Sequence, residues 1–232
     1  MSFVEILAIL VPSTLVYAAP LILTALGGVF SERSGVVNIG LEGIMIIGAF
    51  TSVVFNLTFS DSLGSWTPWV SLVVAMVVAG IFSLLHAVAS ITFRADQTVS
   101  GVAINMLALG ASLFLVKLIY GAGQTDKIAQ PFYKEDIPVL SDIPVLGDIL
   151  FSDVYYTSII AIFISVIVWY VIYKTPFGLR LRSVGEHPMA ADTMGINVNR
   201  MRYIGVFLSG ILGGLGGAVY ATTIALDFNH AT

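Results

Sequence analysis

Two sets of polar side chains stand inside otherwise apolar stretches of this sequence. Asn38 and Glu42 are four residues apart, and Gln97, Gly101 and Asn105 follow one another at the same interval, so each set would share one face of a helix. In a hydrocarbon environment polar groups are tolerated where they contact protein or water. Amide and carboxylate groups on such faces can bind a polar solute through hydrogen bonds.

Each set also has a plainer interpretation. The first could mark the end of a helix at the level of the lipid headgroups, and the second could form hydrogen bonds between packed helices. An intramembrane carboxylate is costly enough to favour a role on a solute path for Glu42. For the second set both interpretations stay open. We therefore predict these candidate solute-pathway residues: Asn38, Glu42, Gln97 and Asn105.

The elements that must position these residues follow from the distribution of charge. Of 232 residues, 57% are hydrophobic, and only 10 Lys and Arg and 14 Asp and Glu are present, far below the share in a soluble domain. Six stretches contain no charged residue, and each is about long enough to cross a ~30 Å hydrocarbon core as a helix: 6–31, 43–60, 62–93, 97–116, 154–173 and 203–226. The sequence thus predicts an all-α polytopic integral membrane protein with about six transmembrane helices in a single domain, 1–232.

Orientation is predicted from the connecting segments, because Lys and Arg are retained on the cytoplasmic side. Segment 174–202 has five basic residues against two acidic ones, and is predicted to be cytoplasmic. Segment 121–153 has two lysines against six acidic residues, and is predicted to be an extracytoplasmic loop. Alternation then places the N-terminus outside. If residues 31–50 instead form a re-entrant or broken helix, the N-terminus would lie inside.

Several classes of function are excluded or disfavoured. The net charge of −4, without any basic run, argues against a nucleic-acid partner, and the absence of cysteine excludes thiol catalysis and thiolate metal sites. No Gly-Lys-Ser/Thr motif is present, so any ATP must be bound by another chain. His86 has no second ligand at metal-site spacing, and no nucleophile elbow surrounds Ser83 or Ser100. We therefore expect no enzyme activity, no cofactor and no metal, with His86 as a packed residue.

Two further segments predict packing and docking. Pro188 suits the first turn of a helix and Gly195 suits its end, so residues 188–194 are predicted to form a short helix. Such a helix is too short to span a membrane, and is either a docking element for another protein or an ordinary interfacial helix. The small residues of 209–218 predict close packing between helices.

Stretches 26–43, 93–101 and 185–196 together resemble the permease subunits of bacterial ABC importers in the branched-chain amino acid, simple sugar and nucleoside group, and most closely the nucleoside permeases. The resemblance implies a transmembrane permease subunit of an ATP-driven importer in the bacterial cytoplasmic (inner) membrane. It would move a small polar solute, a nucleoside first of all, by alternating access. A sugar or branched-chain amino acid permease is the alternative, and an ion-coupled secondary transporter is a more distant one.

The resemblance also implies partners and a site of coupling. The partners would be an ABC ATP-binding subunit that hydrolyses ATP, a second related permease subunit, an extracytoplasmic solute-binding protein and membrane lipid. Because such permeases usually continue through further spans, it implies an incomplete permease. Within the cytoplasmic coupling segment 174–202, where His187 replaces the Asn of many relatives, the implied contacts to the ATPase are Gly185, Glu186, His187, Pro188, Ala190, Ala191 and Gly195.

Overall fold

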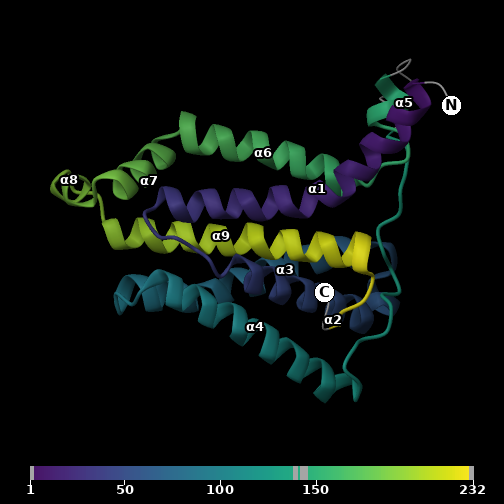
Figure 1. Cartoon of the computed structure of the whole chain (residues 1–232), viewed down its shortest axis with the longest axis horizontal. Coiled ribbons are helices and arrows are strands. Elements are labelled where there is room, and N and C mark those ends of the chain that lie inside the picture. The colour runs from purple at the N-terminus through teal and green to yellow at the C-terminus, as the bar shows by residue number, and fades with distance from the viewer. Residues whose placement is uncertain (1–2, 138–140, 142–145, 230–232) are drawn as a thin grey trace.

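A computed structural model describes residues 3–137, 141 and 146–229. The described residues form helices and connecting turns, as the all-α prediction requires (Figure 1). The elements in chain order are α1 (Phe3–Arg33), α2 (Leu41–Leu63), η1 (Gly64–Trp66), α3 (Thr67–Ala87), η2 (Val88–Thr92), α4 (Gln97–Tyr120), α5 (Leu146–Leu150), α6 (Tyr156–Lys174), α7 (Pro176–Glu186), α8 (Pro188–Thr193), α9 (Val198–Tyr220) and η3 (Ala221–Ala225).

The long helices match the uncharged stretches of the sequence. By length and composition, five helical segments within the described residues could span a membrane, and one of them is a run of 52 residues, Leu41–Thr92. That run contains both α2 and α3, which η1 joins into a pair packed against each other. Counted separately, the two helices agree with the prediction of about six spans. Large apolar side chains such as Phe114 and Phe163, each 65% exposed, cover the outer faces, as expected for contact with lipid.

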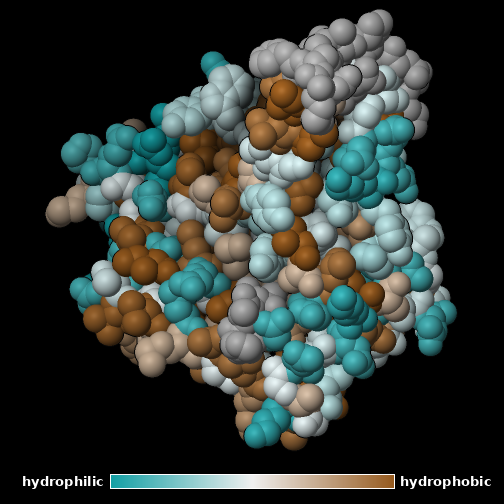
Figure 2. All heavy atoms as spheres, turned by 45° about the vertical axis from the view of Figure 1, so that its right-hand side comes forward, coloured by the Kyte–Doolittle hydropathy of each residue, from teal (hydrophilic) through white to brown (hydrophobic). Residues whose placement is uncertain are grey.

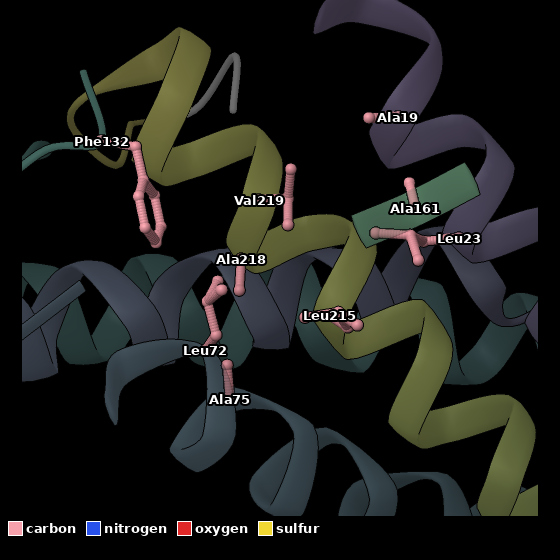
Figure 3. Close-up of a cluster of buried hydrophobic side chains, with 9 residues drawn as sticks. All are labelled: Ala19, Leu23, Leu72, Ala75, Phe132, Ala161, Leu215, Ala218 and Val219. Carbon is pink, nitrogen blue, oxygen red and sulfur yellow. The ribbon is translucent and has the colours of Figure 1, made fainter. Parts of the chain in front are cut away.

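Helix α9 lies at the centre of the bundle, between α1, α2 and α3 (Figure 1). Its glycines allow this approach: a Cβ on Gly48 of α2 would overlap the backbone of Gly214, and one on Gly217 would overlap the carbonyl oxygen of Met45. Close packing of the small-residue segment 209–218 is therefore confirmed. Figure 3 shows one resulting cluster of buried apolar side chains, in which Leu215 and Val219 of α9 are joined by residues of α1, α3 and α6.

The two ends of the bundle differ in structure. Helices α7 and α8 lie at one end, called here the α7–α8 end, and α5 lies at the other with the first turns of α1, called here the α5 end (Figure 1). Residues 125–132 close the α5 end by bonding to the segment after α9, as in the bond from Thr125 N–H to the Phe228 carbonyl at 2.9 Å. Hydrophilic side chains gather on this end among apolar ones (Figure 2). Of the predicted loop 121–153, residues 138–140 and 142–145 lie outside the described residues.

Candidate functional site

Residues 34–40 leave the helical pattern and run as irregular chain along α9. Ser34 packs against Gly205, where an added Cβ would lie 2.6 Å from the Ser34 Cβ. Four residues later, the Asn38 Nδ2 donates a 3.1 Å hydrogen bond to the Ser209 Oγ, and Ser209 is the middle residue of the 23-residue helix α9. Non-helical backbone therefore reaches the middle of the bundle, where a membrane protein tolerates it only against protein or a water-filled cavity.

Within 31–50, where the sequence left a re-entrant or broken helix open as an alternative, the structure shows a break. Helix α1 continues to Arg33, and α2 starts at Leu41 and runs for 23 residues, so the break is confined to 34–40. The break between the two helices is real, and it carries polar backbone groups deep into the bundle. Helix α1 begins at the α5 end, the same end as the predicted extracytoplasmic loop.

Side chains of α4 satisfy the polar backbone of the break. The Gln97 Oε1 accepts a hydrogen bond from the Val37 N–H at 2.8 Å. Asn105 makes two bonds, since its Oδ1 accepts from the Gly43 N–H at 2.7 Å and its Nδ2 donates to the Ile39 carbonyl at 3.2 Å. An amide or carbonyl left unpaired in an apolar environment is destabilising by roughly 2–7 kcal/mol, so these bonds make the break possible.

His86 of α3 holds the same segment from the other side. Its Nε2 lies 3.1 Å from the Val37 carbonyl oxygen, and its Nδ1 lies 3.0 Å from the Ser100 Oγ. A carbonyl can only accept, so Nε2 carries the hydrogen, and in the neutral ring Nδ1 accepts from the serine hydroxyl. The prediction that His86 is a packed residue is confirmed. The sequence did not predict its bond to Val37, because the two residues are 49 positions apart and nothing close to His86 in the sequence indicates a partner.

The structure brings the four predicted pathway residues together around the break. Asn38 is buried, Gln97 and Asn105 are half-buried, and all three are bonded to protein groups. Glu42 differs, because it is exposed in the first turn of α2 and its side chain has no hydrogen-bond or ion-pair partner among the described residues. Three of the predicted residues are therefore bonded to protein groups, while the Glu42 side chain is exposed. Ser209, the partner of Asn38, was missed because it was assigned to packing alone.

The predicted coupling segment forms two short helices at the α7–α8 end. Helix α8 spans 188–193 and is followed by Gly195 in the left-handed conformation (φ 81°), close to the predicted helix 188–194. Glu186, His187, Ala190 and Gly195 are exposed, Gly185 and Pro188 are half-buried, and Ala191 packs in the core. Two methionines next to these residues are also solvent-facing, with exposed fractions of 84% for Met189 and 81% for Met194.

Gly185 joins this segment to the break. A Cβ at Gly185 would lie 2.5 Å from the Arg33 carbonyl oxygen and 3.1 Å from the Gly35 nitrogen, so only glycine fits without a shift of backbone. Gly35 has φ 83°, which also favours glycine. Gly185 and Gly35 thus bring the last turn of α7 into contact with the first residues of the break. Displacement of α7 would therefore act on the chain that leads to Asn38.

Comparison with known proteins agrees with this architecture. A family model described as branched-chain amino acid transport system / permease component matches residues 10–228. The chain is 74% identical to the guanosine ABC transporter permease protein NupQ of Bacillus subtilis and 51% identical to the nucleoside ABC transporter permease protein NupC of Lactococcus lactis, in each case over 100% of this chain and 73% of the relative.

A second guanosine ABC transporter permease protein of Bacillus subtilis, NupP, is 26% identical over 90% of this chain and 59% of its own length. No solved structure matches the chain. The resemblance inferred from the three sequence stretches is confirmed, and these relatives are transport subunits, not enzymes. The chain belongs to the branched-chain amino acid transport system / permease component family, as a membrane permease of the ABC transporter type.

Proposed function

We propose that this chain forms part of the path through which an ATP-driven importer takes up nucleosides across the bacterial cytoplasmic membrane. The observation that carries the proposal is its similarity, over the whole chain, to permeases named for guanosine and for nucleosides. The break at 34–40 supports it, because unwound backbone and amide side chains at mid-depth are typical of sites for polar solutes in transporters.

Glu42 is proposed as the solute contact of this site. Replacement of Glu42 by alanine should reduce nucleoside uptake about tenfold, since hydrogen bonds to a charged group each contribute about 1.5–3 kcal/mol. Radiolabelled uptake at several solute concentrations measures the loss. Asp61→Ala is the matched control, because Asp61 is an exposed acid near the other end of the same helix. Equal uptake in both variants would remove Glu42 from the pathway.

The exposed face of the coupling segment is proposed to dock an ATP-binding subunit. Glu186, Ala190 and Gly195 present groups to solvent there, and Gly185 connects them to the break. Binding of ATP elsewhere can shift the permease between outward-facing and inward-facing states only if the ATPase binds one of these states more tightly. Through the contact between Gly185 and Gly35, a movement of the docked segment would be transmitted directly to the break.

Substitutions on this face should uncouple ATP hydrolysis from transport. In Glu186→Ala and in Gly195→Val we expect an assembled complex that hydrolyses ATP but loses most of its solute uptake, because Gly195 needs a positive φ and Glu186 lies at the docking face. ATPase activity and uptake, measured on the same proteoliposomes, give the ratio of solute taken up to ATP hydrolysed. Glu32→Ala is the control, as an exposed acid at the same end outside the segment. An unchanged ratio in both test variants would contradict the assignment.

Partners and orientation follow from the same proposal. An ATP-binding subunit would meet the α7–α8 end, a solute-binding protein would meet the α5 end, and a second, related permease would complete the solute path. The pair of guanosine permeases in Bacillus subtilis supports a related rather than identical second subunit. The excess of basic residues in 174–202 supports a cytoplasmic α7–α8 end.

Uptake in whole cells tests the solute class. Cells with and without the full-length gene are supplied with radiolabelled guanosine, ribose or leucine. Loss of guanosine uptake alone is the expected result. Loss of ribose or leucine uptake instead would keep the transport role and overturn the solute class.

A further inference from the structure

We propose that a cavity at the α7–α8 end binds an anion that carries a phosphate group. The cavity lies between η2, the start of α4 and the start of α9, and has a volume of about 530 Å³. Six of its eight lining residues are polar or basic, and none is acidic: Ser90, Thr92, Arg94, Gln97, Asn199 and Arg202. Its ligand would be distinct from the transported solute, so the inference goes beyond the proposed function.

Two arginines face this cavity without a carboxylate partner. The described part of the chain contains one ion pair, Lys134 with Asp153, at the opposite end of the bundle. Asp96 is the acid nearest in sequence to the lining residues, and its Oδ1 accepts from the Val99 N–H at 2.9 Å as the cap of α4. The positive charge of the cavity is therefore not neutralised within the described residues.

The strongest indication of a ligand is at Arg202. Its Nε is buried and has no hydrogen-bond partner, which is rare for a guanidinium donor. Arg182 also has a buried Nε without a partner, but its guanidinium lies 5.1 Å from the centre of the Tyr173 ring and so has a cation–π contact. The described residues give Arg202 no comparable contact. The Arg202 guanidinium therefore has no partner within the described residues that an anion in the cavity would have to displace.

The backbone around the cavity is unusual as well. Arg94 has φ 52°, a conformation that is uncommon for residues other than glycine, and the π-helical segment η2 ends two residues before it. Both features occur preferentially at functional sites. They direct the exposed Arg94 to the cavity that Arg202 lines from α9. Paired guanidinium groups are well suited to phosphate, because each presents parallel N–H donors to two oxygens.

The position suggests what the anion does. The Arg202 Nη2 lies 3.5 Å from the point where a Cβ on Gly35 would be, next to the contact between Gly35 and Gly185. A bound anion would fix Arg202 beside the start of the break. It could come from the headgroup of an acidic lipid or from a free phosphate, which share this chemistry.

Binding to the purified full-length importer complex tests the site. Native mass spectrometry measures binding of an acidic lipid, dioctanoyl phosphatidylglycerol. Dioctanoyl phosphatidylcholine serves as the comparison. Equilibrium dialysis with 32P-labelled inorganic phosphate measures binding of the free anion. Arg94→Gln and Arg202→Gln should each weaken binding of the true ligand about tenfold or more. Lys174→Gln should not, because Lys174 is a cation at the same end that lies outside the cavity, 5.6 Å from the centre of the Trp169 ring.

Each outcome decides the proposal. Arginine-dependent binding of phosphatidylglycerol supports it with a lipid as ligand, and arginine-dependent binding of phosphate supports it with a free anion. Binding of neither probe, binding that all three variants retain, or equal binding of phosphatidylcholine overturns it. If Arg202→Gln does not fold, Arg94→Gln remains decisive, since Arg94 is exposed.

Discussion

Replacement of Asn105 by leucine is expected to lower nucleoside uptake at least about tenfold. Leucine has nearly the same size but can neither accept from the Gly43 N–H nor donate to the Ile39 carbonyl. Leaving the N–H of the buried residue Gly43 unpaired is destabilising by about 1–3 kcal/mol. The carbonyl of the exposed residue Ile39 loses its bond as well, and both groups belong to the chain that carries the break into the bundle. The break would then move, and with it Glu42, one residue before Gly43. Initial rates of radiolabelled guanosine uptake measure the effect.

The matched control for this variant is Met106→Leu. Met106 follows Asn105 on α4 and is 72% exposed, and its side chain makes no hydrogen bond within the described residues. Uptake by Met106→Leu should equal that of the wild type, and the amount of each variant in the membrane should be measured alongside. Normal uptake by Asn105→Leu at normal abundance would show that the break does not depend on its bonds to α4.

A leucine at Gly217 should prevent the permease from folding. The backbone of α9 passes so close to α2 here that even a Cβ would overlap the Met45 carbonyl oxygen, and a backbone atom cannot move aside as a flexible side chain does. Overpacking of a tight core commonly destabilises by about 1–3 kcal/mol, and a clash between two backbones belongs at or above the top of that range. Fluorescence-detected size-exclusion chromatography should show aggregation or loss of the variant.

Gly110→Leu provides the comparison that makes this test specific. It is the same substitution within a candidate membrane span, but no atom lies within 4 Å of a Cβ at Gly110. The Gly110 variant should elute as a single species with a melting temperature within a few degrees of the wild type. A monodisperse Gly217→Leu variant with the same melting temperature would contradict the close crossing of α2 and α9.

Local signals in the sequence predicted much of the fold. Gaps between charged residues located the long helices, and Pro188 with Gly195 located α8 almost to the residue. These features act over one or two helical turns, so they are visible without knowledge of the neighbours. The small residues of α9 likewise predicted close packing, although the sequence did not say which helices come close. That depends on contacts between residues far apart, such as Gly217 and Met45.

The arrangement of the candidate site was harder to predict for the same reason. The interval between Asn38 and Glu42 suggested one helical face, yet the helix starts between them at Leu41. The polar face of α4 was compatible with a water-filled path or with packing, and only the position of Val37 and Ile39 beside it shows that Gln97 and Asn105 bind backbone. An isolated periodic pattern predicts that a polar face has a partner, but not which partner.

ATP-driven uptake in proteoliposomes tests the central claim most directly. The full-length importer complex is reconstituted with its solute-binding protein outside and ATP inside, with no ion gradient across the membrane, and accumulation of radiolabelled guanosine is followed. The account predicts accumulation that requires hydrolysable ATP and is mostly lost in Glu186→Ala. Accumulation that proceeds without ATP once an ion gradient is imposed would contradict it, and would point instead to an ion-coupled transporter.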